Sequence, residues 1–267
     1  IKKKQIKISQ TIEYQNTTQD KLDTIYLNDW NNSFSTKTTP LAIRIAEEYK
    51  NDFHLAKNED RGFTVLASIK QNGEDLIFER IKNQTDIVKV ILNKPLEPGS
   101  SYIINLKYLV QIPNDKFTGY GITDTGELQL RYWYITPAVY DGEWQYYSNK
   151  DLNDLFIPKS DIKLDIEFPS NYILTSDLDI SKSTQNTKNK KVTLIGKDRN
   201  TNKLFLNKFN KFNTVQSDNL SFISDINDEG LEVLEKVLVT EKITTFIFDN
   251  FGDYPHEKLL LTQIDYI

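Results

Sequence analysis

Residues 5–14 read Gln-Ile-Lys-Ile-Ser-Gln-Thr-Ile-Glu-Tyr, with Ile6, Ile8, Ile12 and Tyr14 on even positions. Successive side chains of a β-strand point to opposite faces, so this period of two predicts a strand with one buried face. The polar residues 16–20 predict a turn, and residues 22–27 then predict the second strand of a hairpin. The chain is therefore expected to open with β structure.

Strand signals continue through most of the chain. Asn72-Gly73 is typical of a two-residue hairpin turn, and residues 102–110 and 162–168 predict long strands. A short helix is expected to start at Pro40, and the polar residues 181–191 predict an exposed hairpin loop. Strands spaced by about 8–12 residues are typical of antiparallel sandwiches or open sheets. The predicted fold class is mainly β.

The character of the sequence changes near residue 225. Leu231, Leu234 and Leu238 recur at helical spacing, Gly252 stands where a helix would end, and residues 259–264 predict a strand. We therefore expect a β-rich domain at residues 1–222 and the truncated start of a second, α/β domain at residues 223–267. If the helix face at Leu231, Leu234, Leu238 and Phe246 were uncovered, it would favour self-association.

Composition excludes several classes of function. The 33 Lys and Arg residues are interspersed with 38 Asp and Glu residues and the net charge is −5, which argues against nucleic acid as a partner. No apolar run reaches the ~18 residues of a membrane-spanning helix. The chain has no Cys, which fits either a reducing cytoplasm or an exported protein. Because it begins with Ile, we expect that it starts inside a longer product and that any targeting segment has been removed.

The sequence also argues against hydrolytic chemistry within this chain. A catalytic zinc needs three protein ligands, commonly with two His residues four positions apart on a helix and a Glu between them. The only two His residues, His54 and His256, are far apart in the sequence. No Gly-x-Ser-x-Gly or phosphate-binding glycine motif occurs. We therefore predict no catalytic residue, no metal ligand and no cofactor in these 267 residues.

Aromatic residues are concentrated between positions 132 and 147. Two interpretations stay open, a core seam with interdomain packing or a platform for sugar or peptide. The concentration consists of Tyr132, Trp133, Tyr134, Tyr140, Trp144, Tyr146 and Tyr147.

The same stretch carries a resemblance to a known family. Residues 130–141 read Leu-Arg-Tyr-Trp-Tyr-Ile-Thr-Pro-Ala-Val-Tyr-Asp and continue with Gly-Glu-Trp, which resembles a block of bacterial M1 zinc aminopeptidase-like proteins. Residues 251–259, Phe-Gly-Asp-Tyr-Pro-His-Glu-Lys-Leu, look like that family's Gly-x-x-Pro-x-x-Lys-Leu segment. Further similarities lie at residues 12–16, 25–28, 39–42, 95–99 and 161–172.

The resemblance implies a saddle-like, mostly antiparallel β domain that leads into the start of a thermolysin-like domain. It also implies a role as the non-catalytic N-terminal part of a metallopeptidase, packed on its own catalytic domain, which would carry the zinc and act on peptides. Substrate-cleft or interdomain contacts would then come from Trp133, Tyr134, Tyr140, Glu143, Trp144 and Gln145. The family's Gly-Ala-Met-Glu-Asn motif is absent, and no amine-binding residue is assigned.

A different class of function is the alternative. The chain could be a stand-alone β-sandwich module that binds carbohydrate or protein through Trp133, Trp144 and the neighbouring tyrosines. That hypothesis predicts an exposed, flat aromatic face, whereas the peptidase hypothesis predicts that the tryptophans are buried or covered by a following domain.

Overall fold

The computed structural model describes residues 4–216, 220–226, 230, 233–252 and 254–266. Strands make up 48% and helices 16% of it, and most strand pairs are antiparallel, which confirms the predicted mainly β class. The chain divides into two compact units. The first comprises Ile1–Asp161 and Lys197–Thr201, and the second comprises Ile162–Gly196 and Asn202–Ile267.

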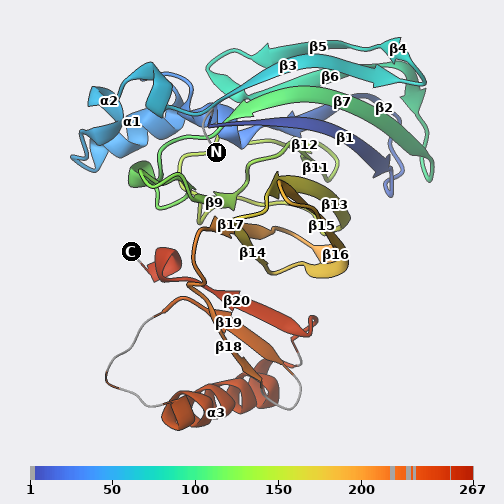
Figure 1. The fold of residues 1–267 in the computed structure, drawn as a ribbon. Coiled ribbons are helices and arrows are strands. Elements are labelled where there is room, and N and C mark those ends of the chain that lie inside the picture. The colour runs from blue at the N-terminus through green and yellow to red at the C-terminus, as the bar shows by residue number, and fades with distance from the viewer. Residues whose placement is uncertain (1–3, 217–219, 227–229, 231–232, 253, 267) are drawn as a thin grey trace. The chain divides into compact units, whose positions relative to one another are not determined.

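The first unit contains two four-stranded sheets, which Figure 1 shows together at the top of the view. Fully buried residues of both sheets, among them Ile25, Val90 and Ile104, build its core. One sheet has the order β1 (Gln5–Gln15), β7 (Ser101–Gln111), β3 (Phe63–Gln71) and β4 (Glu74–Asp75). The other has the order β10 (Thr136–Pro137), β2 (Leu22–Asn28), β6 (Gln84–Leu96) and β5 (Ile77–Ile81).

The long strands follow the predicted alternation. In β7 the side chains of Tyr102, Ile104, Leu106 and Val110 are buried, and the residues between them are largely exposed. β1 pairs with β7 antiparallel over its whole length, from Gln5↔Gln111 to Gln15↔Ser101. Its even-numbered residues are the more buried ones, as the sequence predicts.

The hairpin predicted from β1 to β2 is wrong, because the two strands belong to different sheets. Asn16, only 1% exposed, anchors the crossing. Its backbone N–H donates to Ser100 O at 2.9 Å, and its side-chain Nδ2 donates to Asp20 O at 2.7 Å and to Leu96 O at 3.3 Å. A buried amide needs such partners, so this residue fixes a sheet-to-sheet crossover in place of a two-strand turn.

Two local predictions are confirmed. Asn72 and Gly73 both have positive φ, 50° and 89°, and form the turn between β3 and β4. Helix α1 (Pro40–Glu47) begins where the Pro predicts, and the Thr39 side chain accepts from Ala42 N at 3.4 Å. Leu41, Ala42 and Ile45 of this helix pack in a small core with Phe34, Phe53 and Phe117.

The remaining elements of the first unit are short. They are η1 (Trp30–Phe34), α2 (Asp52–Leu55), η2 (Asn58–Asp60), η3 (Asp115–Phe117), the pair β8 (Gly121–Ile122) and β9 (Leu128–Arg131), and the pair β11 (Val139–Tyr140) and β12 (Trp144–Gln145).

The second unit is built mainly from sheets with few strands. One has the order β13 (Ser160–Pro169), β16 (Asn189–Arg199) and β15 (Asp179–Gln185), and β14 (Ile173–Ser176) pairs with β17 (Lys203–Asn207). The exposed hairpin predicted at residues 181–191 is present, but its loop is shorter than predicted and comprises only residues 186–188. This tract forms most of β15 and the start of β16, whose strands are held by backbone pairing although every β15 side chain is exposed.

The last part of the second unit is α/β. Strands β18 (Asn213–Gln216), β19 (Ser221–Ser224) and β20 (Lys258–Leu261) form a sheet in that order, and β20 runs parallel to β19. Helix α3 (Val233–Phe251) connects these two parallel strands, and the short helix η4 (Gln263–Tyr266) follows β20. This confirms the predicted helix and the strand after it.

Helix α3 exposes much apolar surface. Leu238, Ile243 and Phe246 are 49%, 54% and 62% exposed within this chain, whereas Leu231 and the side chain of Leu234 lie outside the described residues. The predicted self-association stays a prediction. Within the described part of the chain, no helix has both the length and the hydropathy needed to cross a membrane.

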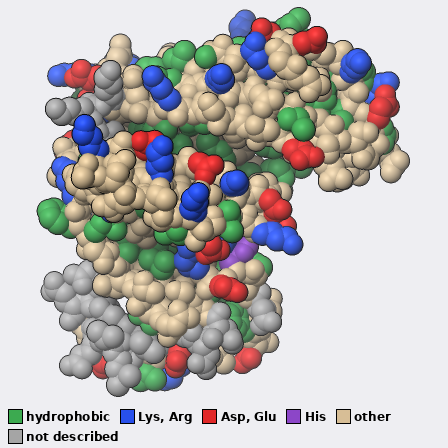
Figure 2. All heavy atoms as spheres, turned by 45° about the vertical axis from the view of Figure 1, so that its right-hand side comes forward, with side chains coloured by type: hydrophobic (Ala, Val, Ile, Leu, Met, Phe, Trp, Pro, Cys, Tyr) green, Lys and Arg blue, Asp and Glu red, His purple; other side chains and the backbone are tan. Residues whose placement is uncertain are grey.

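Charges of both signs are mixed on one face of the molecule (Figure 2). On the face that Figure 2 shows, Lys and Arg side chains lie among Asp and Glu side chains. This agrees with the mixed charge pattern of the sequence, in which 33 cationic residues are set against 38 anionic ones.

Candidate functional site

The aromatic block folds as the hairpin β11–β12 next to strand β2. Tyr140 pairs with Trp144 and Val139 pairs with Gln145, and Gly142, at φ 73°, lies in the turn between them. The backbone N–H of Ala138 donates to Tyr26 O at 2.8 Å, which ties the hairpin to β2. The turn needs a left-handed residue, and Gly adopts that conformation without a steric cost.

One face of the hairpin enters an aromatic cluster, defined as Tyr14, Tyr26, Tyr140, Trp144 and Tyr146. The Trp144 ring lies 5.7 Å from Tyr14, 5.6 Å from Tyr26 and 5.2 Å from Tyr140, centroid to centroid. The rings of Tyr26 and Tyr146 stack at 4.3 Å with an interplanar angle of 1°. All five side chains are half-buried, so the cluster keeps part of its surface open to solvent.

Three phenols of this cluster, those of Tyr14, Tyr26 and Tyr140, have a raised pKa and are neutral near physiological pH. Burial, with a smaller contribution from Tyr140, raises the pKa of Tyr14 to about 12. Burial and then the neighbouring Tyr146 raise the pKa of Tyr26. The hydrogen bond that Tyr140 Oη donates to Asp20 Oδ2, at 2.9 Å, raises the pKa of Tyr140. These three side chains therefore offer neutral, polarisable surface with hydroxyl groups at the rim of the cluster.

The other face of the hairpin is polar. The Tyr147 hydroxyl donates to Gln145 Oε1 at 2.8 Å, and Gln145 Nε2 lies 3.5 Å from Glu143 Oε1. Glu143 and Tyr147 are exposed, and Gln145 is half-buried. Among the predicted site residues, the structure thus brings together Tyr140, Glu143, Trp144 and Gln145 on one hairpin.

Trp133 and Tyr134 lie elsewhere in the first unit. Trp133 is only 6% exposed and its ring meets that of Tyr134 at 5.6 Å, edge to face. Tyr132, before it, has φ 54°, which interrupts the strand alternation, so Tyr132 and Trp133 are both buried. A sequence reader who assumes regular alternation would place one of these two rings at the surface.

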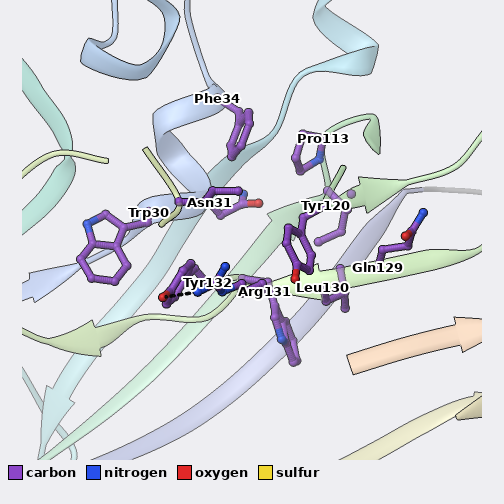
Figure 3. Close-up of a pocket in the computed structure, with 13 residues that line it drawn as sticks. Trp30, Asn31, Phe34, Pro113, Tyr120, Gln129, Leu130, Arg131 and Tyr132 are labelled. Atoms are coloured by element: carbon purple, nitrogen blue, oxygen red, sulfur yellow. Dashed lines mark hydrogen bonds between the residues drawn. The ribbon is translucent and has the colours of Figure 1, made fainter. Parts of the chain in front are cut away.

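These rings line a small cavity, shown in Figure 3. Its volume is about 20 Å³, enough for one water molecule but not for a sugar or a peptide side chain. The Arg131 guanidinium lies 4.8 Å from the centroid of the Tyr132 ring and 5.8 Å from that of Tyr120, and its Nη2 donates to the Tyr132 hydroxyl at 3.2 Å. The surroundings of Trp133 are therefore packing, not an open platform.

Sequence reasoning missed a buried polar group beneath the hairpin. We call it the polar clasp: Asp29, Thr64, Arg80, Asp86, Ser148 and Asn149. Arg80 Nη2 lies 2.6 Å from Asp29 Oδ2, and the Thr64 hydroxyl donates to Asp29 Oδ1 at 2.7 Å. Asp29 is 2% exposed. Only a specific set of donors makes such a carboxylate tolerable inside a protein.

The second half of the polar clasp fixes the chain that follows the hairpin. Ser148 Oγ donates to Asp86 Oδ1 at 2.6 Å, and Asn149 N donates to Asp86 Oδ2 at 2.7 Å. Asn149 Nδ2 donates to Ser33 Oγ at 3.1 Å. Because residues 144–149 are continuous, the polar clasp also sets where Trp144 and Tyr146 enter the aromatic cluster.

Burial dominates the electrostatics of the polar clasp. Burial raises the pKa of Asp29 to about 6, against the opposing effects of Arg80 and Thr64. Burial likewise raises the pKa of Asp86, opposed first by Ser148 and Asn149. Arg80 contacts Asp29 directly and has only the smallest of these effects on Asp86, so burial leaves both carboxyl groups with a raised pKa. The sequence held only a weak signal, since Asp29, Arg80 and Asp86 stand next to or within apolar strands.

The chain matches no protein-family model and no curated protein sequence. Solved structures do resemble it. An M1 zinc metallopeptidase from Deinococcus radiodurans, determined as a variant with a bound Tyr-Ser-Ala substrate, aligns with TM-score 0.56 and 14% identity over 96% of this chain and 52% of that one. An M1 zinc metallopeptidase from the same organism, without the substitution, aligns with TM-score 0.55 and 14% identity over 95% of this chain and 51% of that one. A two-domain M1 zinc metallopeptidase variant bound to L-tryptophan aligns with TM-score 0.54 and 13% identity over 95% of this chain and 52% of that one.

The fold of this chain thus resembles that of part of these M1 zinc metallopeptidases. The chain spans about half the length of these structural neighbours, 52% of the first. The match includes nearly all of the present chain, so it extends over both compact units.

The described part of the chain offers no candidate zinc site. Among the residues that the structure describes, no group of three or more His, Cys, Asp or Glu side chains is placed to hold a metal ion. Each of the two His side chains packs edge to face against an aromatic ring. The ring centroids of His54 and Phe53 lie 6.1 Å apart, and those of His256 and Tyr254 lie 5.4 Å apart. No chemical step through a metal follows from this part of the molecule.

Proposed function

We propose that this chain is the non-catalytic N-terminal part of a bacterial M1-type zinc aminopeptidase. In this proposal residues 1–222 form the β-rich N-terminal domain, and residues 223–267 begin the catalytic domain that carries the zinc and binds peptide substrates. The observation that carries the proposal is the fold match, which includes 96% of this chain but 52% of a peptidase. The succession of antiparallel sheets and then β19, α3 and β20 also supports it.

The hairpin β11–β12 is the element that we propose faces the substrate cleft or the catalytic domain. It presents Glu143 and Gln145 on one side and Tyr140 and Trp144 on the other, and all four retain solvent access. Trp133 and Tyr134 would act from inside the first unit, since Trp133 is buried. A rigid support suits this role, because contacts in a cleft depend on positions held within about 0.5 Å.

Hydrolysis assays test this proposal. The purified 267-residue chain, supplied with zinc and aminoacyl p-nitroanilides, should show no turnover and no stoichiometric zinc by elemental analysis. The complete gene product should contain a His-Glu-x-x-His segment beyond residue 267, hydrolyse the same substrates and lose activity with a chelator. Tight zinc binding with hydrolysis by the short chain, or a complete product without a metal motif, would reject the proposal.

A second candidate function is a binding module for carbohydrate or protein. The half-exposed stack of Tyr26 and Tyr146 beside Trp144 favours it, because sugars pack on such faces. Titration of Trp fluorescence with oligosaccharides separates the two candidates. A saturable change that is lost in Trp144→Leu but kept in Trp133→Phe supports the module, and a flat response to all glycans removes it.

A further inference from the structure

The second unit contains a groove that the proposed function does not use. We call it the β14 groove. Its volume is about 400 Å³, within the range of roughly 300–1,000 Å³ typical of ligand sites. All four residues of β14 line it, together with Leu178, Ile180, Phe212, Thr214, Ile223 and Lys258.

One open sheet edge and the face of a second sheet border this groove. β14 lies at the end of its sheet, whereas Thr214, Ile223 and Lys258 come one from each strand of the sheet β18-β19-β20. An edge strand presents alternate N–H and C=O groups that no neighbouring strand satisfies. An extended peptide can satisfy them by adding a strand, a common mode of peptide recognition.

The walls of the groove are largely apolar, with Thr175, Ser176, Asn210 and Thr214 among the lining residues, and they are partly open. Ile180 is 58% and Ile173 is 38% exposed, whereas Leu178 at the base is fully buried and Phe212 is 6% exposed. Residues of a bound strand alternate between two faces, so every second side chain of a peptide would reach these walls. The groove therefore favours peptides with alternating apolar residues.

Lys258 adds one positive charge. Its side chain is 17% exposed, its Nζ donates to Leu178 O, and it lies 3.3 Å from Asp179 Oδ1. An ammonium group has three N–H donors, and these two contacts occupy two of them. Asp179 is 59% exposed and well solvated, which limits how far it neutralises the lysine. A carboxylate on the occupant would complement Lys258.

We propose that the β14 groove binds an extended peptide segment with alternating apolar side chains and a carboxylate placed near Lys258. The peptide pairs through its main chain with β14 and inserts its apolar residues between Ile173, Ile180 and Ile223. This site involves no zinc chemistry, although Ile223 and Lys258, which line it, belong to residues 223–267, the range that the proposed function assigns to the catalytic domain.

The test uses the full 267-residue chain and a fluorescein-labelled peptide panel. The panel has the form Thr-X-Thr-X-Thr-Asp, with X as Val, Leu or Phe. Each peptide, at about six residues, is longer than strand β14, which has four residues. Fluorescence anisotropy should show saturable binding for at least one member. Ile180→Lys places a charge on the apolar wall and should weaken that binding by about tenfold or more.

Ile195→Lys is the matched control, because Ile195 on β16 is 43% exposed and does not line the groove. It should change the affinity less than about twofold, a difference of roughly 0.4 kcal/mol. Circular dichroism verifies that both variants are folded. If both lysine variants weaken binding equally, or no panel member binds, the proposal is overturned.

Two further comparisons isolate the recognition mode. A peptide methylated at every second amide should lose binding in one register and retain it in the other, because a strand bonds β14 through alternate residues. Lys258→Gln should remove the preference for the Asp peptide over its Asn analogue. Equal binding of the two methylated series, or an unchanged preference, contradicts the proposal. Dimerisation of the chain that Ile180→Lys abolishes, without peptide binding, assigns the groove to a second copy instead and also overturns it.

Discussion

The polar clasp and the aromatic cluster lie at two ends of the same short segment, residues 144–149, yet they are built on opposite principles. The polar clasp encloses Asp29 and Asp86, at 2% and 0% exposure, and depends on a fixed set of donors. The aromatic cluster is half-buried and held by ring packing. Losing one partner leaves a buried charge in the first region but only less contact area in the second. The polar clasp therefore fixes the segment, and the aromatic cluster is free to vary with function.

The largest effect is expected at Arg80. Arg80→Met leaves Asp29 buried without its cation, which should lower the free energy of unfolding by about 3 kcal/mol at pH 7. Urea unfolding followed by circular dichroism measures this loss. Lys89→Met is the control, since Lys89 lies 3.8 Å from the exposed Glu79 at the surface and should cost less than about 0.5 kcal/mol. Equal losses in the two variants would remove the contrast between buried and surface charges.

The next effect is expected at Asp86. Asp86→Ala leaves the buried donors of Ser148 and Asn149 unsatisfied, which should cost about 2 kcal/mol. Asp86→Asn retains one acceptor and should cost less. Trp144 should gain solvent exposure only in the alanine variant, which acrylamide quenching detects when Trp30 and Trp133 are replaced by Phe. Quenching that stays unchanged would show that the polar clasp does not position the aromatic segment.

A smaller effect is expected from pH. The folded-state pKa of Asp29, about 6, exceeds its unfolded value of 3.8, so the folded chain binds the proton more tightly. Stability from this group is therefore gained as pH falls through 6 and lost as pH rises, by about 1 kcal/mol between pH 5 and 7. Urea midpoints at both pH values, for the parent and Asp29→Asn, measure it. A parent slope that survives in Asp29→Asn would assign the effect to another group.

The smallest effect is expected in the aromatic cluster. Tyr146→Leu removes the stacking on Tyr26 but leaves an apolar side chain, so it should cost about 1 kcal/mol. Thermal unfolding measures this change, and Tyr147→Leu on the exposed neighbour serves as the control. A loss as large as that of Arg80→Met would mean that the cluster, too, is a structural core.

The sequence predicted those parts of the fold in which one face of a strand is buried. In β1 and β7 the alternation follows directly from the hydrophobic effect, and Asn72-Gly73 and Pro40 fix their turn and helix locally. β15 was missed, because all its side chains are exposed and backbone pairing alone makes it a strand. The crossover at Asn16 was missed because a local turn signal does not say which sheet the next strand joins.

The candidate site was only partly predictable for a related reason. Tyr140 and Trp144 are close in sequence, so their pairing on one hairpin follows from local spacing. Tyr14 and Tyr26, which complete the aromatic cluster, come from more than one hundred positions away in the chain. Asp29, Arg80, Asp86 and Ser148 are likewise scattered, and isolated polar residues carry no mark of burial. The positive φ of Tyr132 also interrupts the strand alternation, so the burial of Trp133 could not be predicted from an alternating pattern.

The ladder between β1 and β7 has a consequence for how the protein is made. Gln5 pairs with Gln111 and Gln15 with Ser101, so the first strand finds its partner only after about one hundred further residues have been translated. At roughly 5–20 residues per second, the nascent strand waits on the order of 5–20 s without its neighbour. During that interval its Ile-rich face is exposed to chaperones and to premature pairing with other nascent chains. Synthesis rate, more than final stability, is then the quantity to adjust when this chain is produced in quantity.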